Sequence, residues 1–213
     1  MVFHVLNRAA KRTLLFHNAS DYFAFEDLLE EAVERIDVAL FAYCVMPNHW
    51  HLVVAPKTDG ALSRFMHWLT TTHARRWQNA HGVAGLGAVY QGRFKAIPIA
   101  RDPHFLWVCR YVERNPLRAA LVEYAEEWRW SSLHTRTSPW LAEWPVPRPA
   151  DWLTHVNSMQ TEGELERFRD AVRNGRPFGD AKWMEEISRE GHTWQCGVPG
   201  RPCRRTSPTV LQK

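Results

Sequence analysis

Two histidines separated by one residue are the first side chains in this sequence that could do chemistry. His49 and His51 flank Trp50 in the apolar run NHWHLVV. Side chains alternate between the two faces of a β-strand, so both imidazoles would project from one face and the indole from the other. Two adjacent imidazoles can share one metal ion. These residues alone leave two interpretations open: a metal-binding pair, or a buried or capping pair of histidines.

A tyrosine and an asparagine in a second segment, RYVERNPLRAALV, could complete such a site. If residues 102–115 form a helix, Tyr111 and Asn115 are four residues apart and lie on one helical face. The Asn115 carbonyl oxygen suits a hard divalent cation. A tyrosine oxygen can act as a covalent nucleophile when a nearby cation stabilises its phenolate. The alternative is ordinary packing plus a hydrogen bond at a helix terminus.

The elements that would position these residues follow from the spacing of apolar side chains. Strands are expected over residues 2–8, 37–46, 49–55 and 88–99. Helices are expected over residues 21–36, 60–81 and 102–115. Gly92 weakens the last strand, Pro98 breaks it, and the third helix should end before Pro116. The order predicts an α+β fold, a ferredoxin-like split βαβ antiparallel sheet with helices on one face.

The segment after residue 117 is irregular and rich in tryptophan and proline. Trp128, Trp130 and Trp152 are expected to anchor this segment on the core as an extended wrap. Two further short helices are expected over residues 160–173 and 180–190. The sequence therefore predicts a compact domain over residues 1–125, a C-terminal wrap with short helices over 126–200, and a flexible basic tail over 201–213.

Basic residues are concentrated in the middle of the chain. The net charge is +4, and residues 56–118 hold ten Lys and Arg against three Asp and Glu. Such a segment supports a nucleic-acid or phosphate partner, and the alternative is a solvated surface whose charge balance varies by chance. The candidate residues for contact with such a partner, which would be DNA-binding residues under the resemblance described below, are Arg8, Arg64, Arg75, Arg76, Arg93, Lys95, Arg110, Arg114 and Arg118.

Length and composition exclude several other classes of protein. A chain of 213 residues with 45% hydrophobic and 23% charged residues is neither disordered, collagen-like nor a large multidomain machine. Cys44, Cys109, Cys196 and Cys203 form no Cys-x-x-Cys pair, and with His192 they fit no ordinary zinc pattern. No apolar run has the length of a signal peptide or a membrane span, so we expect a cytoplasmic protein.

Six blocks of the sequence together resemble the single-strand DNA transposases of the IS200-like family. The closer resemblance is to the REP-associated tyrosine transposases, and it covers nearly the whole chain in the expected order. The blocks are NHWHLVV, LSRFMHWLTTTHARRW, VYQGRFKAIPI, YVERNPLRAALV, WRWSSL and AVRNGRPFGD. Six ordered blocks are far more specific than either motif alone.

The resemblance implies an HUH endonuclease domain of the Y1 class. His49 and His51 would bind Mg²⁺ or Mn²⁺, and Asn115 would complete the site where other IS200-like enzymes have Gln. Tyr111 would attack a phosphate of single-stranded DNA, leaving a 5′-phosphotyrosine and a free 3′-hydroxyl, and a 3′-hydroxyl could reverse the step. The phosphotyrosine conserves the energy of the phosphodiester bond, so no nucleotide cofactor is needed. Two imidazoles would also accept zinc.

The resemblance implies a DNA partner as well. It predicts a REP-like hairpin with a short flanking single strand, bound by a monomer. Trp50 and Trp77 could stack on unpaired bases, although core packing is the preferred interpretation of both. Relatives usually carry a basic or aromatic segment before the first strand, and we expect that contact to be missing here. In the tail PGRPCRR, Cys203 stands where relatives continue with basic residues.

Two other functions compete with cleavage. A regulator on the same fold could bind hairpin DNA without cutting it, but such a protein has no need of Tyr111. An RNA-binding module could use a ferredoxin-like sheet, but this sequence has no RNP-type aromatic strand.

Overall fold

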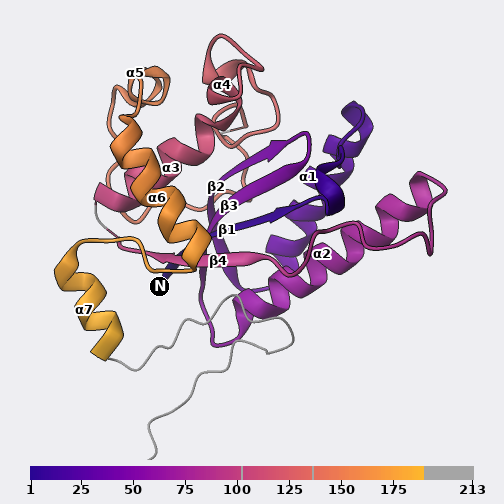
Figure 1. The fold of residues 1–213 in the computed structure, drawn as a ribbon, viewed down its shortest axis with the longest axis horizontal. Helices are drawn as coiled ribbons and strands as arrows, with labels where there is room; N and C mark the ends of the chain where they lie inside the picture. Colours follow the sequence, from indigo (N-terminus) through magenta and orange to yellow (C-terminus); the bar gives the residue numbers. More distant parts are fainter. Residues whose placement is uncertain (102, 136, 190–213) are drawn as a thin grey trace, which may run out of the picture.

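The computed structural model describes residues 1–101, 103–135 and 137–189 (Figure 1). Its strands are β1 (Val2–Arg8), β2 (Val38–Met46), β3 (His49–Pro56) and β4 (Lys95–Ile99). They form one antiparallel sheet in the order β2-β3-β1-β4. This arrangement confirms the predicted ferredoxin-like sheet. Within the described residues, no helix is both long enough and apolar enough to cross a membrane.

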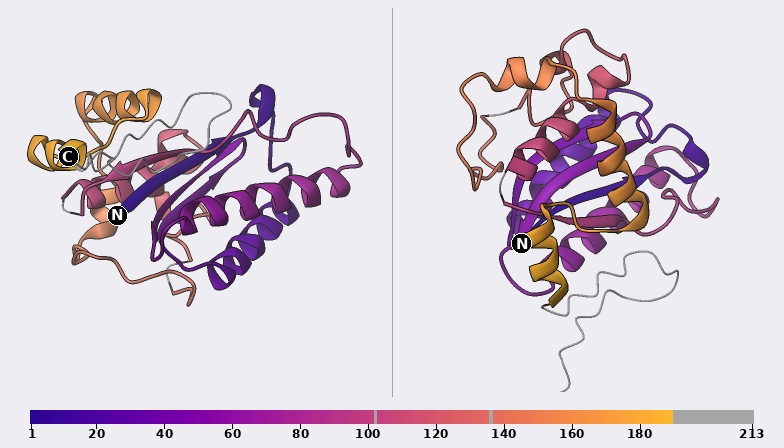
Figure 2. Two further views of the ribbon diagram at one scale, coloured as in Figure 1. Left: turned by 90° about the horizontal axis from the view of Figure 1, so that it is seen from below. Right: turned by 60° about the vertical axis from the view of Figure 1, so that its left-hand side comes forward.

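Helices cover both faces of the sheet. The two crossover helices α1 (Ala19–Arg35) and α2 (Ala61–Ala80) lie side by side on one face, as predicted. The helix α3 (Pro103–Glu113) lies on the opposite face, as Figure 2 shows. The expectation of helices on one face is confirmed for α1 and α2, the two helices of the βαββαβ order, and α3, which follows that order, covers the other face. Sequence periodicity shows that a helix has an apolar stripe but not which face of the sheet that stripe covers.

Each face of the sheet has its own apolar core. Phe25 of α1 and Phe65 of α2 pack with Trp50 in the first core, and all three are fully buried. Phe105 and Val108 of α3 belong to the second core, on the other face of the sheet. Burying such a side chain contributes about 1.5–3 kcal/mol. The position of Trp50 confirms core packing for this residue and assigns the neighbouring histidines to the α3 face.

The fourth strand is shorter than predicted. Residues 88–94 were expected to extend it, but β4 begins only at Lys95, and Tyr90 makes a single isolated bridge to Ala9. The Asn7 side chain donates a hydrogen bond to the carbonyl of Gly92, where a regular ladder would use backbone groups. Pro98 does not break the strand, because β4 is an edge strand whose outer side needs no backbone donor.

Helical structure continues past Pro116, where the sequence predicted an end. A short helix α4 (Asn115–Arg118) follows α3, and Pro116 occupies its first turn, where a missing backbone N–H costs nothing. The backbone N–H of Arg118 donates to the carbonyl of Arg114 at 2.9 Å. Arg118 is thereby kept on the same side of the helical rod as Tyr111 and Asn115.

The segment after residue 118 wraps back over the second core. It contains a 3₁₀ turn η2 (Ala125–Glu127) and the helices α5 (Trp152–Asn157), α6 (Glu162–Asn174) and α7 (Ala181–Arg189), while another 3₁₀ turn, η1 (Ala10–Arg12), follows β1. The two predicted C-terminal helices are confirmed, and α5 was not predicted. The expected tail over 201–213 and the residues His192, Cys196 and Cys203 lie outside the described residues.

Tryptophans hold this wrap in place, as predicted. The indole N–H of Trp128 donates to the carbonyl of Val45 at 2.9 Å. The indole N–H of Trp152 donates to the buried carboxylate of Glu113 at 2.7 Å. Trp130 stacks against an aromatic ring of α1, with 4.7 Å between the ring centroids. The wrap is therefore attached to both cores through side chains that combine a large apolar surface with one polar group.

Candidate active site

Strand β3 presents the predicted histidine pair on the sheet face that α3 covers. His49 and His51 lie two residues apart on this central strand, and their ring centroids are 5.0 Å apart. His51 is 5% exposed, and His49 is only half-buried. His51 is therefore shielded from solvent, whereas His49 is accessible to it.

Helix α3 brings Tyr111 to this pair. The Tyr111 ring lies edge-on to the His51 ring, with 5.9 Å between the centroids. Tyr111 is 9% exposed, because Trp107 stacks on one side of it and Phe168 of α6 packs against it at 4.6 Å. Residues 60 positions apart in the chain thus meet on one face of the sheet.

Asn115 lies in the same cluster, but its oxygen is engaged. The Nη2 atom of Arg118 donates to Asn115 Oδ1 at 2.7 Å. The Arg118 guanidinium also lies over the Tyr111 ring, 4.1 Å from its centroid. The sequence analysis placed Arg118 among the DNA-binding residues, whereas the structure places it between the two side chains of the Tyr-x-x-x-Asn motif. The continuation of helix through Pro116 produces this arrangement.

A third histidine, His4, belongs to the cluster and was missed by the sequence analysis. His4 is fully buried on β1, and its Nε2 atom lies 2.9 Å from Nδ1 of His51. The two rings are stacked, with 14° between their planes. His4 pairs with Val53 across the sheet, so it is the diagonal neighbour of His51. The run VFHVLNR shows a histidine in a strand, but only the strand order brings that strand beside β3.

Burial keeps the three imidazoles in their neutral form. It lowers the pKa of His4 to about 3. Burial, with smaller contributions from the charges of Arg8 and Arg118, lowers the pKa of His49 to about 4. The pKa of His51 is also well below its ordinary value, chiefly because of burial. Neutral imidazoles are the form that binds metal ions.

The donor atoms of this cluster are of the kinds that bind a divalent cation. Nδ1 of His49 and Nδ1 of His51 are hydrogen-bonded to neighbours, and among the described residues neither Nε2 atom has a hydrogen-bond partner. Asn115 Oδ1 accepts one hydrogen bond and keeps a second lone pair. Within the described ranges, no three His, Cys, Asp or Glu residues gather as a metal site. A cation here would therefore use two imidazoles and an amide oxygen.

The predicted basic residues do not form one continuous patch. Arg64, Arg75 and Arg76 lie on α2, on the sheet face opposite the histidines, and Arg76 pairs with Glu31 of α1 at 3.2 Å. Arg8 ends β1 directly opposite His49 and shares its face of the sheet. Arg93 is exposed just before β4, which begins at Lys95.

Arg110 and Arg114 have structural partners. Arg110 is buried and donates to the carbonyl of Ser158 at 2.7 Å, and Arg114 donates to the carbonyl of Asn157 at 2.6 Å. Both carbonyls lie at the C-terminal end of α5, where cations are favoured. These two guanidinium groups therefore tie α3 to the wrap, in addition to any contact with DNA.

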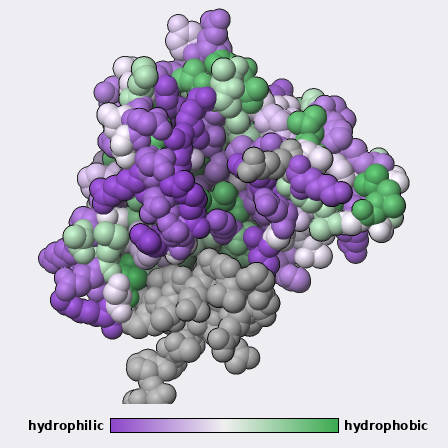
Figure 3. Space-filling view, viewed as in Figure 1, coloured by the Kyte–Doolittle hydropathy of each residue, from purple (hydrophilic) through white to green (hydrophobic). Residues whose placement is uncertain are grey.

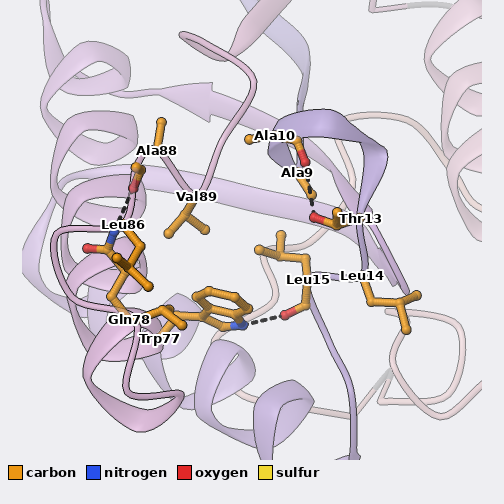
Figure 4. Close-up of a pocket in the computed structure, with 12 residues that line it drawn as sticks. Ala9, Ala10, Thr13, Leu14, Leu15, Trp77, Gln78, Leu86, Ala88 and Val89 are labelled. Atoms are coloured by element: carbon orange, nitrogen blue, oxygen red, sulfur yellow. Dashed lines mark hydrogen bonds between the residues drawn. The ribbon is translucent and has the colours of Figure 1, made fainter.

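Two cavities of the described part of the molecule lie outside this cluster. One, of about 210 Å³, is bounded by Leu14 and Leu15 on one side and by Trp77 and Leu86 near the end of α2 on the other (Figure 4). The indole N–H of Trp77 donates to the carbonyl of Leu15 there, so Trp77 packs on the core, which was the preferred interpretation of this residue. The second cavity, of about 710 Å³, lies under the wrap between Phe41 and the segment around residue 144. The histidines and Tyr111 line neither of these two cavities.

The surface next to the site is strongly polar. Figure 3 shows hydrophilic side chains gathered over α6, whose inner side buries Leu165, Phe168 and Ala171. Hydrophobic side chains gather at the far end of α2, where Leu86 is 80% exposed. The helix that covers Tyr111 is therefore amphipathic, with its apolar side against the site.

Comparison with known proteins gives a family and a fold. The family model described as "Transposase IS200 like" matches residues 1–115. A solved structure described as "Structure of the REP associates tyrosine transposase bound to a REP hairpin" is similar with a TM-score of 0.53 and 18% identity, covering 70% of this chain and 85% of that chain. A "putative transposase" from Deinococcus radiodurans R1 is similar with a TM-score of 0.40 and 17% identity, covering 53% and 88%. No curated protein matches the sequence.

Proposed function

The chain belongs to the IS200-like transposases, and on that premise we propose that it is a metal-dependent, single-strand DNA endonuclease and strand transferase that uses Tyr111 as its nucleophile. The observation that carries this proposal is the placement of Tyr111 beside His51, with 5.9 Å between the rings. Residues that are 60 positions apart converge on one face of the sheet, together with Asn115 and Arg118. A protein that only binds DNA has no need of this convergence.

The proposed reaction exchanges one phosphodiester for another. The Tyr111 oxygen attacks the scissile phosphorus, a Tyr–O–P bond forms, and the bond from phosphorus to the 3′-oxygen breaks. The departing 3′-oxygen takes up a proton and becomes a 3′-hydroxyl, while the 5′ side stays on Tyr111. Attack by a 3′-hydroxyl on this phosphotyrosine rejoins DNA and releases the phenol. Every bond broken is replaced by one of the same kind, so the cycle consumes no nucleotide.

The residues around Tyr111 have separate tasks in this proposal. His49, His51 and Asn115 would hold Mg²⁺ or Mn²⁺, which when bound polarises a phosphate oxygen. Arg118 lies over the ring of Tyr111 and can stabilise negative charge on its oxygen and on the phosphate. Trp107 and Phe168 fix the ring of Tyr111 and exclude water from its faces.

The proposed substrate is hairpin DNA of the REP type with a flanking single strand. The similar structure whose description names a REP hairpin supports this substrate. Arg8, Arg93 and Lys95 are basic residues on or next to β1 and β4, and they could contact the phosphate backbone, although the Lys95 amino group also donates to the carbonyl of Val172 at 3.3 Å. We also propose that the protein acts as a monomer.

We further propose that residues 1–125 form the catalytic domain and that residues 126–200 form a wrap that supports it. The second core is built from both parts, because Phe168 of α6 packs against Tyr111 of α3. The basic tail over residues 201–213 would be a separate third part.

The test is a search for the covalent intermediate. Purified protein is incubated with labelled hairpin oligonucleotides that carry a single-stranded flank and Mn²⁺, and the products are run on a denaturing gel. We expect a band that migrates as a protein–DNA adduct. The adduct should be absent with Tyr111→Phe and with EDTA, and phosphotyrosine should be found at Tyr111 by mass spectrometry.

Hairpin binding measured in parallel separates the two candidate functions. Tyr111→Phe should bind the hairpin as well as the unchanged protein, because the substitution removes one oxygen. Tight binding without an adduct in Mg²⁺, Mn²⁺ or Zn²⁺ would overturn the nuclease proposal and favour a hairpin-binding regulator on the same fold.

A further inference from the structure

The two catalytic histidines both have their Nδ1 atoms occupied by neighbours. Nδ1 of His51 lies 2.9 Å from Nε2 of His4, and Nδ1 of His49 lies 2.6 Å from Oδ1 of Asn48. Neither Nε2 atom has a hydrogen-bond partner among the described residues. In both rings, therefore, Nδ1 is hydrogen-bonded to a neighbouring side chain and, within the part of the chain that the structure describes, Nε2 is not.

We propose that His4 and Asn48 are positioning residues that hold the Nδ1–H tautomer of His51 and His49 and so present both Nε2 lone pairs to one cation. This inference rests on the proposed function, because it concerns the same site. It adds two residues to that site, neither of which would itself touch the metal or the DNA.

The orientation at His49 follows from the chemistry of its partner. A carboxamide oxygen can only accept a hydrogen bond, so Nδ1 of His49 must donate to Asn48. A neutral imidazole carries one hydrogen, and Nε2 of His49 is then left with a lone pair. Asn48 precedes His49 in the turn between β2 and β3, where its backbone carbonyl also accepts from the N–H of Ala9. Asn48 is therefore held by one hydrogen bond through its side chain and by another through its backbone.

The orientation at His51 depends on which ring donates. Only one hydrogen can lie between the two nitrogens, so either His51 donates from Nδ1 or His4 donates from Nε2. In the first case Nε2 of His51 keeps its lone pair. In the second case Nε2 of His51 carries a hydrogen and cannot bind a cation. We infer the first arrangement, in which His4 is the acceptor, because it leaves Nε2 of His51 without a hydrogen and able to bind a cation. The hydrogen of His4 then lies on Nδ1, which is buried and has no hydrogen-bond partner among the described residues.

The position of His4 leaves its ring little freedom to rearrange. The ring is fully buried, is stacked on His51 and packs against Phe168 at 5.2 Å. Ligand histidines in metal sites are commonly oriented by an outer partner that accepts their second N–H, and loss of such a partner weakens metal binding about 10–100-fold. A buried histidine on a rigid central strand can serve as that partner.

The tautomers can be measured directly in the metal-free protein. Two-bond ¹⁵N–¹H correlation spectra of protein labelled at histidine nitrogens distinguish a protonated nitrogen from one with a lone pair, and His51→Gln identifies the His51 signals. We expect Nδ1 to be protonated and Nε2 unprotonated in both His49 and His51. Protonation of His51 at Nε2 would overturn the assignment of His4 as acceptor.

Variants of His4 then test whether this orientation matters for the cation. His4→Leu should weaken Mn²⁺ binding, followed by electron paramagnetic resonance, by about 10–100-fold. His4→Gln keeps an oxygen acceptor and should restore most of the affinity and the His51 tautomer. Val2→Ala is the matched control, because it removes buried volume from the same face of β1, at the end of the strand where Val2 pairs with Ile99. Its Mn²⁺ affinity should stay within about two-fold.

The outcomes separate this inference from the proposed function. If the tautomers are as inferred but the protein binds no Mn²⁺, the metal site fails and the orientation by His4 and Asn48 stands. If Mn²⁺ binds and His4→Leu, folded as judged by its near-ultraviolet circular dichroism, binds it equally well, the positioning role is refuted and the metal site stands. Should His4→Leu fail to fold, the spectra of His4→Gln and of the unchanged protein still decide the question.

Discussion

The guanidinium of Arg118 lies 4.1 Å from the ring centroid of Tyr111, seven residues earlier in the chain. The same group donates to Asn115 Oδ1 at 2.7 Å, so one cation contacts both ends of the Tyr-x-x-x-Asn motif. Burial lowers the pKa of Arg118, and interactions with Tyr111 oppose this effect. The positive charge is therefore held over the ring whose oxygen would attack and later leave as phenolate.

Arg118→Ala should slow formation of the covalent adduct by about 10²-fold, because a fixed cation that stabilises developing charge is removed. Binding of the hairpin should change much less. Arg189→Ala is the control, because Arg189 forms an exposed ion pair with Glu185 on α7, and this variant should cleave normally. An unchanged rate of adduct formation by Arg118→Ala, measured under single-turnover conditions, would contradict this role.

Phe168→Ala should destabilise the protein by about 3–5 kcal/mol, because a fully buried ring is replaced by a cavity. It should also expose Tyr111, since Phe168 packs on that ring at 4.6 Å. Denaturant unfolding gives the first quantity, and hydroxyl-radical footprinting with mass spectrometry gives the second. Phe25→Ala empties a similar volume on the opposite face and should leave the footprint of Tyr111 unchanged.

Trp152→Phe should loosen the wrap. The substitution removes the indole N–H that donates to the buried Glu113 carboxylate, at a cost of about 1–3 kcal/mol. Limited proteolysis should then cut residues 126–189 faster than in the unchanged protein. Trp68→Phe, on α2, is the comparison, and equal cleavage rates for the two variants would show that the Glu113 contact does not hold the wrap.

Stability should fall as the pH is lowered through the histidine range. His73 is buried and hydrogen-bonded to the hydroxyl of Tyr90, and burial lowers the pKa of His73 to about 3. A pKa depressed in the folded state means that the unfolded chain takes up the proton first. The stabilisation is complete above about pH 6.5 and is lost as the pH falls toward 3, by about 2–3 kcal/mol between pH 6.5 and 4.5. His73→Gln should show a shallower decline in unfolding free energy over this window, and an equal slope would refute the assignment.

Arg8→Ala should weaken hairpin binding and reduce the slope of log K against log salt concentration by about 1, because one phosphate contact is lost. Arg8 lies opposite His49 on the site face of the sheet. Arg75 is exposed on α2, on the other face, so Arg75→Ala should leave the slope unchanged. Equal effects of the two substitutions would indicate that DNA contacts both faces.

The sequence determined the order and nature of most elements. Strand alternation in NHWHLVV placed His49 and His51 on one face and Trp50 on the other, and the structure has this arrangement. Helical spacing similarly located α1, which was expected over residues 21–36 and runs over Ala19–Arg35, where the Asn18 side chain accepts hydrogen bonds from the first backbone N–H groups. These features are local, because the backbone geometry of a strand or a helix fixes the direction of each side chain relative to its neighbours in the chain.

Only the tertiary structure decided which elements meet. The composition of the site depends on β1 lying beside β3, which brings His4 to His51, and on α3 crossing the face opposite α1 and α2, which brings Tyr111 to the same place. The tertiary structure also places Arg8 on the opposite face of the sheet from the basic residues of α2, although the charge pattern along the chain grouped most of these residues together. Contacts between distant segments depend on how all the apolar surfaces pack at once, and the local pattern of a single segment does not contain that information.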